Sequence, residues 1–492
     1  MNINLEFLRY ASQISQFDAH TFIAKGPNEQ RTISREDLGY YHAVVIGAVY
    51  EFTDGLILDS PSALFKPLAH CIREHPFLGV LVADRHTNKA YYQRAPVVNL
   101  EEHIEILSEH VSADTKGWHA VEEVLKSNLD RPYSHAIPPW RVIVLPLGGP
   151  QYFIAFAYSH TIGDGPTGIS FHRSLLEAVR MPATAEQLEA PIVAPSTQPL
   201  PPPFDTPQRL SISWSFLLGP LIAVLVPSFV ANWLGVKAHI ATVDDETWAG
   251  SPACFDPSHP EASRSKVIVR VVEGCLVEKA VQESRKHGAK LTGTLHQFIV
   301  RALSKTVAGS QTTKFISETS INMRKSVGVP LNEMGEFASA TYVTHPKSSC
   351  SGPLTQDEWA IAISSTNRFA EVAVTLHDQP IGLLRYVPNM KKWLSGKMGQ
   401  RRDCSYEISN IGVFVDEHPE DSGKAKIEHV VFAQPGHVSS APICFNFSTI
   451  KGGNMVYTVT WPTGALGVAE TEEENLIDAV CRSIQIDFEE LL

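Results

Sequence analysis

Runs of β-branched and aromatic residues alternate along the first 180 residues with segments of helical apolar spacing. Four of the runs are typical of buried strands: 44–52, 78–84, 140–146 and 152–160. Two segments carry apolar side chains on one helical face: 61–76 and 118–129. This alternation predicts an α/β unit over residues 1–180.

The same pattern returns after residue 263, beyond a segment of different composition. Eight prolines lie between residues 181 and 208, a density that excludes helix and sheet and favours an extended crossover. The later strands are expected at 266–274, 315–323, 406–414, 426–434, 441–450 and 455–462, and the helices at 295–309, 357–373 and 472–491. We therefore predict two α/β domains, 1–180 and 264–492, joined by the crossover 181–263.

Residues 210–236 form an uncharged, mostly apolar stretch that is long enough to span a bilayer. Pro220 and Pro227 interrupt it, and the flanking charges set no orientation, so we expect that it does not cross the membrane. Two interpretations stay open: a peripheral contact with the membrane interface, or a cover over the mouth of a substrate tunnel.

Charge and cysteine content exclude several classes of function. The 492 residues carry 53 acidic and 41 basic side chains, a net charge of -12, so a phosphate backbone is repelled and no nucleic-acid partner is expected. Seven scattered cysteines and a start without a secretory signal indicate a cytoplasmic chain with reduced thiols. Because no close His/Cys cluster occurs, we predict no metal site.

The strongest chemical signal is HTIGDG at 160–165, which follows a hydrophobic strand and precedes a helix. A histidine at a strand end can act as a general base near neutral pH, although a hydrogen-bonded structural histidine is the alternative. Asp164 could orient the ring of His160 or tie the loop to an arginine. Gly163 and Gly165 favour the second role, because glycine permits the positive φ of a sharp turn.

HTIGDG resembles the HxxxDG motif of the acyl-CoA-dependent acyltransferase superfamily, which includes chloramphenicol acetyltransferases, plant acyltransferases, peptide-synthetase condensation domains and fungal alcohol acetyltransferases. The resemblance implies two chloramphenicol-acetyltransferase-like domains, each a mixed β-sheet with flanking helices, and a tunnel between them. Residues 320–328 resemble the strand whose arginine pairs with the motif aspartate, which implies an Arg324–Asp164 pair. Residues 405–414 resemble a tunnel-lining strand of the fungal enzymes, which implies that Ser409 and Asn410 bind the substrate or the oxyanion.

The resemblance favours the fungal branch, because the DFGWG loop of the plant enzymes is absent, and free acyl-CoA, because no carrier-protein domain is fused. We expect a monomer, with no permanently bound cofactor, that moves an acetyl or other short acyl group from acyl-CoA to a hydroxyl of a small apolar metabolite. His160 is then the base, with no covalent intermediate. Two alternatives stay open: transfer or condensation to an amine, and a non-catalytic member that binds a ligand or a carrier protein.

Overall fold

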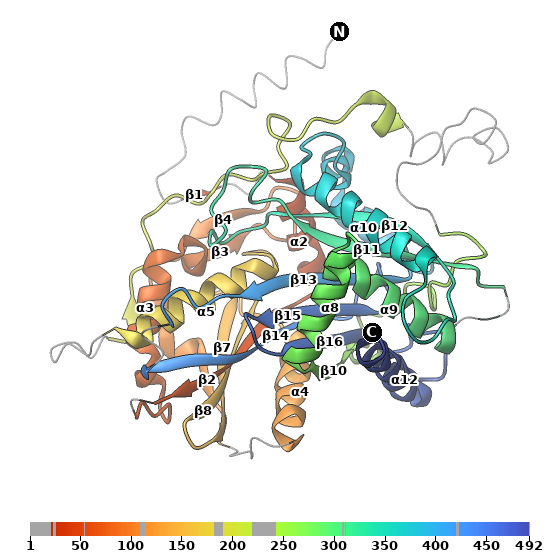
Figure 1. Ribbon diagram of the computed structural model, residues 1–492. Helices are drawn as coiled ribbons and strands as arrows, with labels where there is room; N and C mark the ends of the chain where they lie inside the picture. Colours follow the sequence, from red (N-terminus) through yellow and green to blue (C-terminus); the bar gives the residue numbers. More distant parts are fainter. Residues whose placement is uncertain are drawn as a thin grey trace, which may run out of the picture.

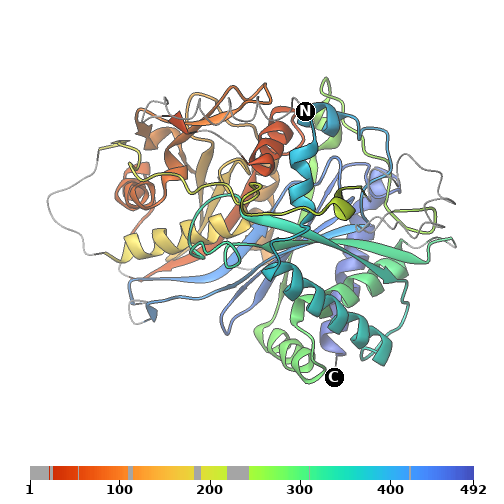
Figure 2. The same ribbon diagram turned by 90° about the horizontal axis from the view of Figure 1, so that it is seen from above.

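The computed structural model describes residues 21–22, 26–53, 55–108, 115–181, 190–218, 243–307, 309, 311–419 and 423–491. Two large mixed β-sheets carry helices on their faces (Figure 1), which confirms the expected α/β architecture. Figure 2 shows the N-terminal half, coloured red to yellow, beside the C-terminal half, coloured green to blue.

The first sheet has five strands, in the order β14 (Ala425–Ala433), β2 (Val44–Phe52), β8 (Gln151–Tyr158), β7 (Trp140–Gly148) and β6 (Ile104–Ile106). Ile46 on β2 packs in one core with α3 (Phe65–Glu74) and α5 (Gly165–Arg180). The neighbouring Val45 packs in another core with α4 (Thr115–Leu129). Because both faces are covered, these strands are continuous hydrophobic runs in the sequence.

The second sheet has six strands, in the order β10 (Ser265–Val272), β16 (Met455–Pro462), β15 (Cys444–Ile450), β13 (Tyr406–Phe414), β11 (Lys314–Asn322) and β12 (Ala338–Pro346). Its helices are α8 (Gly274–Lys286), α9 (Leu291–Thr306), α10 (Gln356–Val374) and α12 (Glu470–Glu489). Buried Arg301 of α9 donates to Glu358 of α10 and Asp487 of α12, which ties the three helices together. One face of the sheet is thereby covered. The other face packs against α4 at β10 and β16, and at β11, β12 and β13 it lines a cavity.

Strand β14 joins the two halves, because it pairs with β2 in the first sheet although it follows β13 in the chain. In Figure 2 blue strands accordingly extend from the C-terminal half into the N-terminal half. The domain limits 1–180, 181–263 and 264–492 stay predictions. The remaining strands are β1 (Thr21–Phe22), β4 (Tyr91–Arg94) and β3 (Val80–Ala83) in one small sheet, and β5 (Val98–Asn99) with β9 (Ile192–Val193) in another.

Several short helices lie outside the elements described so far. They are α2 (Pro27–Asp37), α11 (Met390–Ser395), η2 (Pro61–Leu64), η3 (Pro76–Gly79), η4 (Leu100–Glu102), η5 (Pro260–Ser263) and η6 (Pro380–Tyr386). Most of the uncharged segment 210–236 lies outside the described residues, and its start, Leu210, packs in a core with Ile381 and Leu384 of η6. Within the described ranges no helix is long and apolar enough to cross a membrane. Whether the segment meets a membrane or covers a tunnel stays a prediction.

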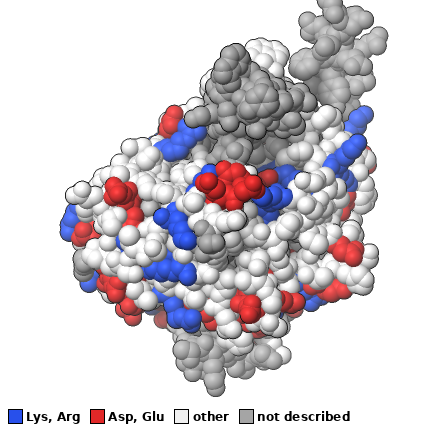
Figure 3. Space-filling view, turned by 90° about the vertical axis from the view of Figure 1, so that its right-hand side faces the viewer, with Lys and Arg blue, Asp and Glu red and all other residues white. Residues whose placement is uncertain are grey.

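On the face shown in Figure 3, acidic and basic side chains of the described residues are interspersed. That face therefore carries no continuous basic surface for a phosphate backbone.

Candidate active site

A cavity of about 680 Å³ is lined by residues from both halves of the chain, including His160, Asp164, Glu318, Glu336 and Glu407. Its walls combine the loop after β8, helix α2, and the uncovered face of the second sheet at β11, β12 and β13. The cavity is partly open to solvent, and groups from both halves of the chain can meet a small molecule in it.

His160 lies in the loop between β8 and α5, and its side chain is 17% exposed toward this cavity. Its Nδ1 lies 2.7 Å from Oε2 of Glu336, and its ring meets the ring of Tyr41 edge-on at 5.3 Å. Nε2 makes no hydrogen bond within the described part of the chain. The loop is held on both sides of the histidine, because Ser159 donates to Glu36 and Tyr92 donates to the carbonyl of Thr161. Nδ1 thus lies at ion-pair distance from a carboxylate without the geometry of a hydrogen bond, and Nε2 is free for chemistry.

Asp164 pairs with Arg324 across the two halves, as the motif resemblance implies. Nη1 and Nη2 of Arg324 donate to the two carboxylate oxygens over 2.8 and 2.6 Å, and the N–H of Phe337 donates to Oδ2 over 3.0 Å. The two side chains are 3% and 0% exposed. Asp164 is also the N-cap residue of α5, yet its carboxylate does not cap that helix. The contact is confirmed, and no contact joins Asp164 to the imidazole.

The prediction of positive φ at Gly163 and Gly165 is wrong, because neither lies in the left-handed region. Close approach requires glycine there instead. A Cβ on Gly163 would lie 2.2 Å from Oγ1 of Thr167, and one on Gly165 would lie 2.6 Å from Cγ2 of Ile411 on β13. The two glycines let α5 begin directly behind the histidine and against the second half of the chain.

Glu336 is a site residue that sequence reasoning missed. It is buried in the connection between β11 and β12, which also carries Arg324, and its Oε1 accepts a hydrogen bond from Asn28 over 3.2 Å. The carboxyl of Glu29 lies nearby, and burial together with Asp205 raises its pKa to about 8. No periodicity or motif marks a glutamate in such a connection, so its place beside His160 depends on the tertiary fold.

Ser409 and Asn410 both line the cavity from β13, as expected. The amide of Asn410 is engaged within the protein, because Nδ2 donates to Thr292 and Oδ1 accepts from the N–H of Gly412. The hydroxyl of Ser409 makes no hydrogen bond among the described residues. Their roles toward the substrate or the oxyanion stay predictions.

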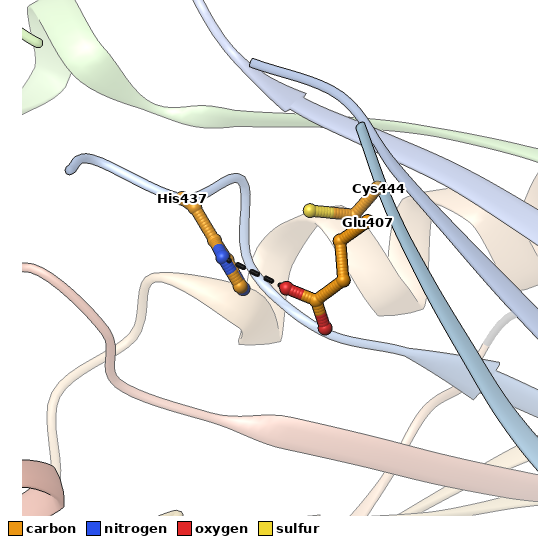
Figure 4. Close-up of side chains that lie close together, drawn as sticks. All are labelled: Glu407, His437 and Cys444. Atoms are coloured by element: carbon orange, nitrogen blue, oxygen red, sulfur yellow. Dashed lines mark ion pairs between the residues drawn. The ribbon is translucent and has the colours of Figure 1, made fainter. Parts of the chain in front are cut away.

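A second polar cluster in the same region joins Glu407, His437 and Cys444 (Figure 4). Their ligand atoms lie within 4.8 Å of one another, and Oε2 of Glu407 is 3.1 Å from Nδ1 of His437. Burial and the neighbouring Glu318 raise the pKa of Glu407 to about 7, while burial and nearby arginines hold the pKa of His437 well below its usual range. Sequence spacing did not show this set, because β13 and β15 bring Glu407 and Cys444 into register. Such donors are ones that zinc binds in proteins.

The sequence is similar to a known family and to several fungal proteins. A family model described as alcohol acetyltransferase matches residues 96–482. An uncharacterized protein from Schizosaccharomyces pombe is 22% identical over 441 residues, which cover 88% of this chain and 91% of the relative. A probable alcohol acetyltransferase from Aspergillus fumigatus is 20% identical over 469 residues, which cover 90% and 96%.

Solved structures agree on the fold. A trichothecene 15-O-acetyltransferase from Fusarium sporotrichioides aligns with a TM-score of 0.62 at 13% identity and covers 94% of each chain. The starter condensation domain of rhizomide synthetase aligns with a TM-score of 0.59 at 11% identity and covers 98% of this chain and 96% of its own. Since the family model spans well over half of the sequence, the chain belongs to the alcohol acetyltransferase family and is an acyltransferase enzyme.

Proposed function

We propose that the protein transfers an acetyl or other short acyl group from acyl-CoA to a hydroxyl of a small molecule, with His160 as general base. The observation that carries this proposal is the position of the His160 imidazole. Its Nδ1 lies 2.7 Å from Oε2 of Glu336, and its Nε2 makes no hydrogen bond among the described residues that line the cavity. A carboxylate at Nδ1 favours the tautomer in which Nε2 can accept a proton, and it stabilises the imidazolium that then forms.

The reaction needs no covalent acyl-enzyme. Nε2 of His160 removes the hydroxyl proton while the oxygen attacks the thioester carbonyl, so a C–O bond forms and the carbonyl oxygen becomes an oxyanion. Collapse of this intermediate breaks the C–S bond, and the imidazolium returns its proton to the leaving thiolate. The Ser409 hydroxyl, the Asn410 amide or a backbone N–H would stabilise the oxyanion.

The pair of Asp164 and Arg324 supports the base without touching the proton. Its bidentate contact connects the loop of His160 to the connection that carries Glu336, so both partners of the 2.7 Å contact are held by one buried ion pair. Ile381 and Leu384 of η6 line another part of the cavity, which supports an acceptor with an apolar body.

The proposal is tested by incubating the protein with acetyl-CoA and a panel of alcohols and amines, with products detected by mass spectrometry. We expect O-acetyl products, and His160→Ala should lower kcat by about 10²- to 10⁴-fold. The matched control is His119→Ala on the surface of α4, which should leave turnover unchanged. N-acetyl products as the preferred outcome, or binding without turnover, would contradict the proposal.

A further inference from the structure

Two acidic side chains lie next to each other on the sheet face that lines the cavity. Glu318 and Ser320 on β11 and Glu407 and Ser409 on β13 alternate at the period of a strand, so they share one face, and all four line the cavity. Glu318 and Glu407 are direct neighbours in the parallel register. Like charges at such positions destabilise a sheet, and Glu407 is only 4% exposed. Placing the two glutamates side by side therefore lowers the stability of the sheet, and a role in ligand binding would explain why both are present.

The protein satisfies this carboxylate pair only in part. Glu407 accepts from Gln434 at Oε1 over 2.9 Å, and Ser440 donates to Oε2 of Glu318 over 2.8 Å. Glu318 also shares a hydrogen bond with the hydroxyl of Tyr342, its neighbour in register on β12, and Ser320 donates to Oε1 of Glu407 over 3.4 Å. Because a carboxylate offers about four acceptor sites, both glutamates keep acceptor capacity. Nδ1 of His437 is buried and lies 3.1 Å from Glu407 without the geometry of a hydrogen bond. Hydrogen-bonding capacity thus remains at the cavity surface, where an unmade bond is costly.

Arg35 of α2 adds an unused donor to the same wall of the cavity. Its guanidinium stacks over the ring of Tyr41 at 4.3 Å and forms no ion pair with any residue that the structure describes. Arg35 acts electrostatically on both Glu318 and Glu407. The lining therefore offers a charged donor and a carboxylate acceptor to one polar group.

Tyr41 connects this wall to the reaction centre. Its ring contacts the ring of His160 at 5.3 Å and that of His437 at 5.6 Å, and its hydroxyl donates to Gln434 over 3.0 Å. The two histidines thus flank one aromatic ring in one cavity. A small acceptor with one hydroxyl at His160 can extend along Tyr41 to the carboxylate pair.

The local charge favours a neutral ligand group. Arg35 acts on both glutamates and offsets part of their negative charge. An ammonium group or a metal ion at this wall would be repelled by the guanidinium of Arg35. A hydroxyl, which both donates and accepts, matches the remaining acceptor capacity of a carboxylate and the donor capacity of the Arg35 guanidinium.

We propose that Glu318, Glu407 and Arg35 form a subsite that binds a second hydroxyl of the acceptor, so that the substrate class is a diol or polyol with an apolar body. This inference rests on the proposed O-acyl transfer, because it is the acceptor's first hydroxyl that His160 deprotonates.

Binding and turnover are measured separately so that the two proposals can fail independently. The probes are α,ω-diols from 1,4-butanediol to 1,8-octanediol and the matching 1-alkanols. Kd values are measured by ligand-observed NMR on the His160→Ala variant with CoA present, and turnover is measured on the unmodified protein with acetyl-CoA. At one chain length or more, the diol should bind about 10-fold or more tightly than the alcohol, since a hydrogen bond to a charged group contributes about 1.5–3 kcal/mol.

Two variants in the His160→Ala background test whether Glu318 causes the tighter binding of the diol. Glu318→Gln should reduce it toward the factor of about two that two equivalent hydroxyls give by statistics, whereas the control Glu278→Gln, exposed on α8, should preserve it. Turnover without a diol preference in binding would overturn the subsite and leave the proposed function standing. Diol binding that depends on Glu318, without turnover, would support the subsite and overturn the function, and absence of both would overturn both.

Two further results would overturn the neutral subsite. One is tighter binding of the ω-amino alcohols than of the diols. The other is stoichiometric zinc in the purified protein that is lost in Cys444→Ser, because the cluster of Glu407, His437 and Cys444 would then be a metal site.

Discussion

Replacing Asp164 with asparagine should destabilise the protein strongly, because it removes one charge from a fully buried ion pair. In the native pair, both terminal nitrogens of Arg324 donate to the carboxylate over 2.8 and 2.6 Å. An asparagine keeps one acceptor oxygen and presents a donor NH₂ to the other guanidinium nitrogen. The remaining partners of Arg324, the carbonyls of Glu333 and Gly335 and the side chain of Asn322, are uncharged.

The expected magnitude follows from these contacts. One charge-assisted hydrogen bond is lost, which costs about 1.5–3 kcal/mol, and the uncompensated buried guanidinium brings the total to about 3–5 kcal/mol. For a cooperative unit of 150–250 residues this corresponds to a fall in Tm on the order of 10 °C. Turnover should fall with it, because the pair holds the loop of His160 against the connection that carries Glu336.

The assay is thermal unfolding followed by circular dichroism, with kcat measured on the same samples. The matched control is Asp245→Asn, which removes the same charge from the pair of Arg401 with an aspartate that is 95% exposed, and it should change Tm little. Adding Arg324→Met to Asp164→Asn should recover part of the stability, since no unpaired charge then stays buried. A Tm for Asp164→Asn within the range of the Asp245 control would refute the reasoning.

Two further changes test the surroundings of the base. Glu336→Gln should lower kcat by about 10-fold or more while the KM for acetyl-CoA and the Tm change little, because an amide no longer favours the proton on Nδ1; equal losses in Tm would indicate a merely structural role. Glu29→Gln should gain stability relative to the unmodified protein as pH rises from about 5 to 8. Between the ordinary pKa of 4.5 and the folded pKa of about 8, the folded state retains a proton that the unfolded chain releases, so the native free energy of unfolding falls with pH by a few kcal/mol. Chemical denaturation across this pH range measures the difference in the free energy of unfolding between Glu29→Gln and the unmodified protein. A difference that does not change with pH would contradict the raised pKa of Glu29.

Local pattern predicted most elements of the fold. Strands such as β2 and β8 are visible as hydrophobic runs because the sheet buries both of their faces, and helix α10 is visible from its apolar spacing. The sheet to which β14 belongs was not predictable in this way. Its composition is that of any buried strand. Its pairing with β2 is a long-range interaction that depends on strand register and on packing against the rest of the first sheet.

The residues of the site can likewise be separated into those predicted from local sequence features and those that only the tertiary fold brings together. His160, Asp164 and Arg324 were accessible from the sequence, because a turn of small residues after a strand and a family motif are local features. Glu336 beside the imidazole, Glu318 next to Glu407, and Cys444 near His437 were decided only by the tertiary structure. Each comes from a different strand or connection, and only chain crossing and strand register bring such side chains together. A single buried glutamate leaves no periodic signal in the sequence, since its meaning lies in the partners that the fold places around it.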